Sequence, residues 1–319
     1  MPQTFKIGHY TDLNHITGCT VILCPPHTVA SCHIAGSSPG SRELALLAPD
    51  KKMESIHALF LTGGSAFGLN AASGVMNYLE EKEIGYSTPF GLIPIVPAAV
   101  IYDLNIGSPK FRLQAEHAYQ ACQSATADFT EQGSIGAGTG ATIGKWAGLK
   151  SAMKGGMGIH KVALDQAWIT AVSIVNSVGD IVDYNGQIIA GAIDQNFDFL
   201  AAEKNLRFQS TADINFGENT VLCVLLTNIK LSKLQAYLLA QRSQNGLARA
   251  ISPASTSYDG DVIFCLSNGN VQADIDLAVE MGSEAMRKSI IESVRQAQSL
   301  GGFISAADRY KEKQHQGNA

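Results

Sequence analysis

The sequence lacks the concentration of positive charge that marks several protein classes. None of its stretches is rich in lysine and arginine, and the formal net charge of the 319 residues is -5. A surface that binds nucleic acid or an anionic membrane needs a cluster of basic side chains. We therefore expect no nucleic-acid partner and no membrane partner, and we expect a small peptide or amide substrate instead.

The sequence also lacks targeting and membrane signals. The first residues, MPQTFKIGHYTDL, have neither the charged start nor the apolar middle of a signal peptide, which favours a cytoplasmic protein. The uncharged run from Ile84 to Tyr102 is long enough to suggest a membrane span, but Pro89, Pro94 and Pro97 interrupt it. A buried segment is the expected structure for this run.

Cysteine and histidine patterns with the spacing of a metal site are missing as well. The eight histidines form no H-x-x-x-H pair, and the six cysteines are not closely paired. No metal and no other cofactor is implied. We expect buried free thiols at all six positions: Cys19, Cys24, Cys32, Cys122, Cys223 and Cys265.

The composition and the apolar pattern indicate one globular domain over residues 1–319. The chain is 45% hydrophobic, and no Pro/Ser-rich or charged linker divides it. Only the polar end from Arg309 to Ala319 reads as a tail. Short buried strands are expected at Cys19–Pro25, Ala58–Thr62, Ala167–Val175, Val221–Leu226 and Val262–Leu266, and helices at Leu69–Lys82, Ala115–Asp128, Leu231–Arg242 and Ile275–Ser299. Strands that are apolar on both faces need cover on both sides, so the pattern predicts an α/β (α+β) layered fold.

Three glycine clusters lie between these elements: GGSAFGLN from Gly63, GAGTGATIGKWAG from Gly136 and KGGMG from Lys154. The first fails the nucleophile-elbow pattern because Phe67 stands where a glycine is needed. The second matches neither the dinucleotide fingerprint nor the phosphate loop, since Trp146 follows Gly144-Lys145. The small residues let the backbone approach closely, either to a substrate or to another part of the chain.

The junction between Asn219 and Thr220 is the most informative boundary in the chain. A polar segment from Phe208 to Asn219 meets an apolar strand that begins at Thr220. A threonine hydroxyl in this place can attack the preceding carbonyl and release a new N-terminal threonine. The freed α-amine is a base on the same residue, and its ordinary pKa of about 7.7–8.0 suits proton transfer near neutral pH.

The chain as a whole resembles the DmpA-like family of L-aminopeptidase/D-esterases and β-peptidyl aminopeptidases. The segments that carry the resemblance are TGCTVIL, AGSSPGSRE, HALFLTGGSAFGLNAASGVM, PIVPAAVIYDLNIG, GAGTGATIGK, KGGMG, AVSIVNSVGD, ENTVLCVLLTN and NGLARAISPASTSYDGDVIF. The resemblance implies an αββα sandwich of the N-terminal-nucleophile type. It also implies self-cleavage into residues 1–219 and 220–319, and a homo-oligomer of cleaved protomers.

The resemblance also assigns roles to individual residues. Thr220 matches the nucleophile, Asn176 the amide that stabilises the oxyanion, and Tyr102 an active-site tyrosine. Asp259 and Asp261, in YDGD, match the positions that orient the nucleophile and its amine, where well-known members have Ser and Glu. Gly64 and Ser65 are candidates for the wall of the substrate pocket.

One departure from the family pattern lies just before these aspartates. Relatives commonly have His-Thr where this chain has Ser255-Thr256, which affects the local substrate contacts. The expected activity is an aminopeptidase or amidase that acts by acyl transfer to Thr220. Two alternatives stay open: an amidase or esterase of secondary metabolism, and a ligand-binding homologue that does not cleave itself.

Overall fold

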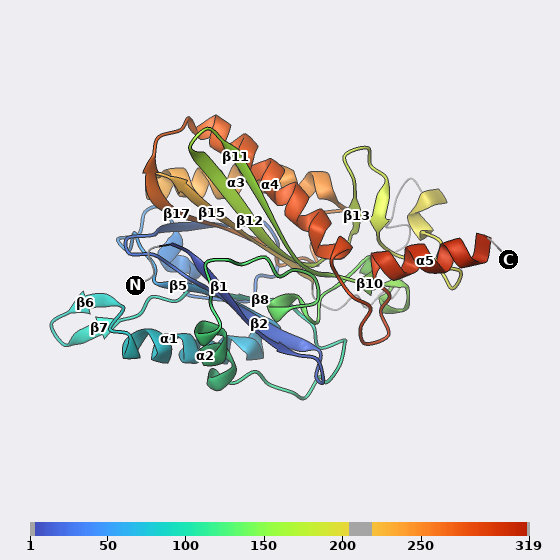
Figure 1. The fold of residues 1–319 in the computed structure, drawn as a ribbon, viewed down its shortest axis with the longest axis horizontal. Coiled ribbons are helices and arrows are strands. Elements are labelled where there is room, and N and C mark those ends of the chain that lie inside the picture. The colour runs from blue at the N-terminus through green and yellow to red at the C-terminus, as the bar shows by residue number, and fades with distance from the viewer. Residues whose placement is uncertain (1–3, 204–218, 318–319) are drawn as a thin grey trace.

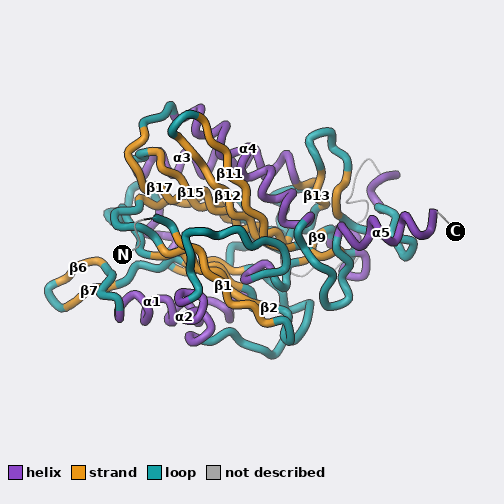
Figure 2. Tube along the Cα trace, in the orientation of Figure 1, coloured by secondary structure: helices purple, strands orange, loops and turns teal. Residues whose placement is uncertain are grey.

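The computed structural model describes residues 4–203 and 219–317, and its main elements form four layers. Two five-stranded sheets lie face to face. A pair of helices covers the outer face of each sheet (Figures 1 and 2). The predicted αββα sandwich is therefore confirmed.

The first sheet has the strand order β1-β2-β5-β8-β4. Its strands are β1 (Lys6–Asp12), β2 (Thr17–Leu23), β5 (Ala58–Thr62), β8 (Ala98–Val100) and β4 (Ser41–Arg42). Helices α1 (Ala72–Glu81) and α2 (Ala115–Gln123) pack on its outer face and enclose an apolar core with Val21, Phe60 and Val75. The other face of this sheet turns toward the second sheet.

The second sheet has the order β11-β12-β15-β17-β3. Its strands are β11 (Gly156–Leu164), β12 (Ala167–Asn176), β15 (Thr220–Ile229), β17 (Val262–Val271) and β3 (Val29–Ile34). Helices α3 (Lys233–Ala250) and α4 (Ile275–Arg295) cover its outer face. Burial of both faces explains the long apolar runs that the sequence shows in these strands.

Strand β15 is the central strand of the second sheet. Because side chains alternate along a strand, Val221, Cys223 and Leu225 join the core under α3 and α4, whereas Leu222 and Val224 join the core between the sheets. This alternation decides which face of the sheet each residue at the start of the strand presents.

The remaining regular elements are short. Three small sheets are formed by β6 (Tyr86–Thr88) with β7 (Gly91–Ile93), β9 (Thr142–Ile143) with β10 (Met153–Lys154), and β13 (Asp180–Val182) with β14 (Ile188–Ala190) and β16 (Ile251–Ser252). A 3₁₀ helix at Ser65–Ala71 leads into α1. None of the helices that the structure describes is long and apolar enough to cross a membrane.

Two expectations from the sequence are wrong. The run from Ile84 to Tyr102 is buried only in part: β6 and β7 form a hairpin that projects from the first sheet (Figure 1), and Phe90 at its turn is fully exposed. Prolines and glycines turn this segment outward before β8 enters the sheet. The polar end is not an irregular tail either, because α5 (Ala306–Gly317) is helical through most of it.

Other expectations hold with shifted ends. The helix expected to begin at Leu69 starts as the 3₁₀ turn, α2 ends at Gln123, and α3 runs eight residues past Arg242 to Ala250. All six cysteines are free and buried, as predicted. Burial raises the pKa of each of these thiols well above the usual range. The expected loop from Phe208 lies outside the described residues up to position 218.

Candidate active site

The start of β15 brings Thr220 and Asn176 together. The two residues lie directly opposite each other, at the last pair of the antiparallel ladder between β12 and β15. Thr220 shares the strand face of Leu222, and Asn176 that of Ile174, and both of these apolar residues pack between the sheets. The nucleophile and amide predicted from the sequence therefore face the same side.

The peptide bond between Asn219 and Thr220 is buried and closely surrounded. Asn219 is inaccessible to solvent and Thr220 is 4% exposed. The Thr220 hydroxyl donates to the Asn219 carbonyl oxygen at 2.6 Å, and the Gly260 backbone N–H donates to the same oxygen at 2.7 Å. The threonine oxygen thus lies against the carbonyl that it would attack, and a second donor polarises that carbonyl.

Asp259 and Asp261 are buried on either side of Gly260. Asp261 Oδ1 accepts the Val221 N–H at 2.8 Å, which ties this carboxylate to the residue after Thr220. Burial and the neighbouring charge of Asp259 raise the pKa of Asp261. The predicted pair of carboxylates therefore does gather beside the Asn219–Thr220 junction.

Asp259 uses only one of its two oxygens. Oδ2 accepts the Thr256 N–H at 2.8 Å and the Thr256 hydroxyl at 2.7 Å. Oδ1 is buried and has no hydrogen-bond partner among the residues that the structure describes. A buried carboxylate oxygen without a donor is costly, so this atom is a ready acceptor for a new N–H group.

Ser255, the departure from the family pattern, contacts the second aspartate. Its hydroxyl donates to Asp261 Oδ2 at 3.2 Å and receives the Gln244 side-chain amide at 3.3 Å. The Ser255-Thr256 pair therefore supplies one hydroxyl to each carboxylate. In this chain Ser255 and Thr256 thus hold the two aspartates by neutral hydrogen bonds.

The Asn176 side chain is fixed by a residue that the sequence reasoning missed. Lys145 is buried, and its amino group donates to Asn176 Oδ1 at 2.9 Å and to the Asn176 backbone carbonyl at 3.2 Å. The Thr142 N–H donates to the same Oδ1 at 3.0 Å. With two donors on the oxygen, the amide nitrogen must point the other way, and Nδ2 donates to the Tyr102 carbonyl at 2.9 Å.

Lys145 also has an unusual electrostatic setting. Burial lowers its pKa to about 7, while the charges of Asp259 and Asp103 oppose that shift and Lys154 adds to it. One sequence signal could have found it: Lys145 is the only charged residue in the small and apolar stretch GATIGKWAG. Such a lysine either folds back to solvent or finds buried carbonyl partners.

A small cavity of about 260 Å³ opens onto Thr220. The described residues that line it are neutral: Ser38, Pro39, Gly40, Ser65, Ala66, Val100, Tyr102 and Thr220. Of the two pocket residues suggested by the sequence, Ser65 lies in the wall. Gly64 does not line the cavity but anchors the loop, since its N–H donates to Asp103 Oδ1 at 2.6 Å.

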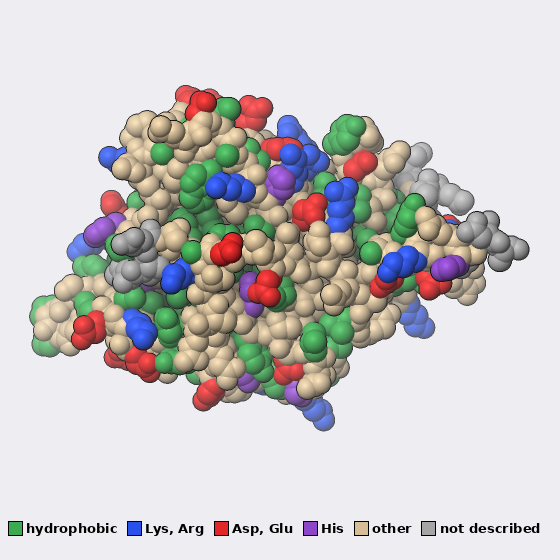
Figure 3. Space-filling view, viewed as in Figure 1, with side chains coloured by type: hydrophobic (Ala, Val, Ile, Leu, Met, Phe, Trp, Pro, Cys, Tyr) green, Lys and Arg blue, Asp and Glu red, His purple; other side chains and the backbone are tan. Residues whose placement is uncertain are grey.

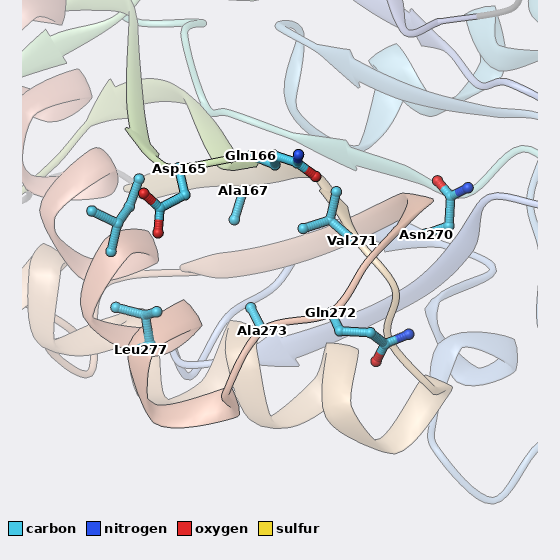
Figure 4. A pocket seen from close by; sticks show the side chains of 9 residues that line it. Asp165, Gln166, Ala167, Asn270, Val271, Gln272, Ala273 and Leu277 are labelled. Carbon is cyan, nitrogen blue, oxygen red and sulfur yellow. The ribbon is translucent and has the colours of Figure 1, made fainter.

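A larger pocket of about 580 Å³ lies at the opposite end of the sheet (Figure 4). It is lined by the turn after β11 and the end of β17, including Gln166 and Val271. Val271 pairs with Ile229 at the last position of β15, and a strand of ten residues spans about 30 Å. Size therefore does not identify the reactive site, because this pocket is far from Thr220.

The surface carries no dominant charge on the face drawn in Figure 3. Lysine, arginine, aspartate and glutamate side chains are scattered among neutral ones over this face. None of the described residues that line the cavity beside Thr220 has a charged side chain. The described residues therefore offer shape and neutral hydrogen bonds for specificity at this cavity.

The four layers match those of the Ntn hydrolase fold, and the family comparison identifies the chain as a peptidase. The chain belongs to peptidase family S58, whose model matches residues 3–307. An uncharacterized aminopeptidase of Mycobacterium leprae is 36% identical over 329 aligned residues, covering 93% of this chain and 90% of the relative. A 6-aminohexanoate-oligomer endohydrolase of Paenarthrobacter ureafaciens is 29% identical, covering 78% of this chain and 68% of the relative.

Solved structures share the same architecture. The L-aminopeptidase D-Ala-esterase/amidase of Ochrobactrum anthropi, described as a variant of the Ntn hydrolase fold, has a TM-score of 0.73 at 16% identity and covers 98% of this chain and 92% of that one. A Burkholderia β-aminopeptidase gives the same values. The expected membership in the aminopeptidase family is confirmed, and at this identity the structural likeness concerns the fold.

Proposed function

We propose that the chain is an autoproteolytically activated aminopeptidase or amidase in which Thr220 is the nucleophile. One observation carries the proposal: the Thr220 hydroxyl and the Gly260 N–H both donate to the carbonyl oxygen of Asn219. The hydroxyl oxygen therefore lies beside the carbonyl whose carbon it would attack, and the Gly260 N–H lies where negative charge develops on the oxygen. The junction is also buried, so a separate protease has no access to it.

The proposed self-cleavage has two balanced steps. The Thr220 oxygen bonds to the Asn219 carbonyl carbon, the carbon–nitrogen bond breaks, and the hydroxyl proton passes to the leaving nitrogen. Water then hydrolyses the resulting ester, which leaves a carboxylate on Asn219 and a free α-amine on Thr220. The products are chains 1–219 and 220–319.

After cleavage, the new amine becomes the base. It takes the proton of the Thr220 hydroxyl as this oxygen attacks the substrate carbonyl, and it returns the proton to the leaving amine. Water then hydrolyses the acyl ester on Thr220, which releases the acid and restores the hydroxyl. Asp259 Oδ1, which is buried and without a partner among the described residues, is the acceptor that we assign to the new ammonium. Asp261 keeps the start of β15 in place through Val221.

The oxyanion of the substrate is assigned to Asn176. One N–H of its Nδ2 donates to the Tyr102 carbonyl, and we assign the other to the oxyanion because Asn176 lies opposite Thr220 in the ladder. Lys145 and Thr142 hold the amide in this orientation from the opposite side. The Tyr102 side chain lines the cavity, and its hydroxyl is a second candidate donor.

We assign a small aminoacyl peptide or amide as the substrate class, because the cavity is small and the described residues that line it are neutral. The 6-aminohexanoate-oligomer endohydrolase among the relatives favours a second candidate, an amidase that cleaves non-peptide amides. A panel of L-aminoacyl, D-aminoacyl and β-aminoacyl amides beside an aminohexanoate oligomer separates the two.

The test of the proposal is Thr220→Ala. The purified wild-type protein should show two bands on denaturing electrophoresis, near one third and two thirds of 33.8 kDa, and a terminus that begins Thr-Val-Leu-Cys. Thr220→Ala should stay a single inactive chain, and Thr220→Ser should still be cut because it keeps the hydroxyl. A cut or active Thr220→Ala protein would place the nucleophile elsewhere.

A further inference from the structure

The three glycine clusters meet around two buried charges, Lys154 and Asp103. Neither residue has a part in the reaction described above. Lys154 is inaccessible to solvent and Asp103 is 2% exposed. Buried charged side chains are rare unless they are paired or fully hydrogen-bonded, so their partners show what they do.

The amino group of Lys154 is surrounded by backbone carbonyls of two glycine clusters. It donates to Ala141 O at 2.8 Å, to Gly155 O at 2.9 Å and to Gly138 O at 3.3 Å, which uses all three of its N–H donors. A Cβ on Gly138 would clash with the backbone at Gly156 and Met157. The glycines that do not match the phosphate-loop pattern thus let backbone carbonyls bind a lysine of the same chain.

The Asp103 carboxylate holds the third glycine cluster. Oδ1 accepts the Gly64 N–H at 2.6 Å, and Oδ2 accepts the Thr17 hydroxyl at 2.7 Å. A Cβ on Gly63 or on Gly140 would clash with this carboxylate. Asp103 therefore lies between the loop that leads to Ser65 in the cavity wall and the loop that Lys154 holds.

A single peptide group connects Lys154 to the proposed oxyanion donor. The carbonyl of the Ala141–Thr142 peptide accepts the Lys154 amino group, and the N–H of the same peptide donates to Asn176 Oδ1 at 3.0 Å. A donor on the carbonyl polarises the peptide and strengthens its N–H as a donor. The orientation of the Asn176 amide thus depends on Lys154 through one planar peptide group.

We infer that Lys154 is a positioning residue for hydrolysis, acting through the Ala141–Thr142 peptide on Asn176. Burial lowers the pKa of Lys154, and the charge of Asp103 opposes that shift. The inference rests on the proposed function, because it assigns to Asn176 the role of oxyanion donor.

The experiment is a double-mutant cycle on the processed enzyme. Lys154→Met should lower kcat on an aminoacyl p-nitroanilide by about 10–100-fold, the usual range for residues that orient a functional group, and leave KM within about threefold. In an Asn176→Ala background the same change should have almost no further effect on kcat. If Lys154→Met does not fold, Lys154→Gln, which keeps two N–H donors, enters the same cycle.

The matched control is Lys233→Met. Lys233 is also buried, and its amino group donates to the backbone carbonyls of Leu46 and Lys51, away from Thr220. This variant should lose stability without losing kcat. A loss of kcat that is equal in both Asn176 backgrounds, or equal to that of Lys233→Met, would overturn the inference.

A second measurement needs no activity. In the uncut Thr220→Ala chain, Lys154→Met should speed hydrogen exchange over residues 136–144, whereas Lys233→Met should speed it over residues 46–51. Unchanged exchange over residues 136–144 would overturn the role of Lys154 even if Thr220 proved not to be the nucleophile. The kinetic cycle, in contrast, requires an active processed enzyme. An inactive wild-type protein would therefore count against the proposed function, whereas the exchange experiment tests Lys154 by itself.

Discussion

Gly260 is the residue whose replacement tests the geometry of self-cleavage most directly. Its N–H donates to the Asn219 carbonyl oxygen at 2.7 Å. An added Cβ would lie 3.0 Å from the Thr220 hydroxyl oxygen and would clash with the Ser38 carbonyl. Gly260→Ala therefore leaves every functional group present but displaces the donor, the nucleophile or both.

The size of the effect follows from what is displaced. Loss of one oxyanion donor costs about 10²–10³ in rate, and a misplacement of about 1 Å near the reacting atoms costs about 10². We expect the half-time of cleavage between Asn219 and Thr220 to lengthen about 100-fold. Because the added Cβ would lie 2.3 Å from the Ser38 carbonyl oxygen, the backbone at Ser38 must shift by about 1 Å, so we also expect some loss of stability.

The assay is the time course of the two product bands after rapid purification, with the new terminus identified by mass spectrometry. Gly269→Ala is the matched control, because its Cβ would also meet a backbone carbonyl, that of Asn228, at the far end of β17. It should process at the wild-type rate. Equal rates for Gly260→Ala and the wild type, or equal slowing by Gly269→Ala, would refute the reasoning.

Two further predictions concern the residues behind Thr220. Asn176→Ala in the processed enzyme should lower kcat by about 10²–10³ with little change in KM, measured by steady-state kinetics; a change in KM alone would remove Asn176 from the oxyanion site. Lys145→Met should alter the pH dependence of stability. Burial lowers the pKa of Lys145 to about 7, while the unfolded chain keeps a value of about 10.4, so between them the unfolded state binds more protons. Relative to the Lys145→Met variant, the free energy of unfolding of the protein that keeps Lys145 should therefore rise between about pH 7 and 10. The rise should be up to about 1.4 kcal/mol per pH unit. Urea titrations of both proteins in the uncut Thr220→Ala background measure this difference, and parallel curves would contradict it.

The layers and the strand that carries Thr220 could be predicted from the sequence because they depend on local pattern. Apolar runs such as Val221–Leu226 are long enough to be buried on both faces, which requires cover on both sides. The family resemblance then placed Thr220, Asn176 and the two aspartates, and the structure does bring these residues together. Their mutual distances were not predictable, since they come from three separate strands and loops.

The projecting hairpin shows where local pattern was insufficient. An uncharged run with Phe90 and Ile93 looks buried in the sequence, yet both residues are exposed. Hydrophobicity gives a preference for burial but does not say which surface is available to bury it. That depends on whether a neighbouring layer reaches the segment.

The sequence by itself determined the alternation of buried strands and amphipathic helices. It also determined that the hydroxyl of Thr220 stands at a boundary between a loop and a strand. Only the tertiary structure decided that Lys145, Lys154 and Asp103 stay buried behind that hydroxyl. The physical reason is that the free energy of a buried charge depends on partners from other parts of the chain: Gly138 and Ala141 supply two of the carbonyls around Lys154, and the donors to Asp103 come from β2 and from the loop after β5. Those partners exist only once the layers have packed.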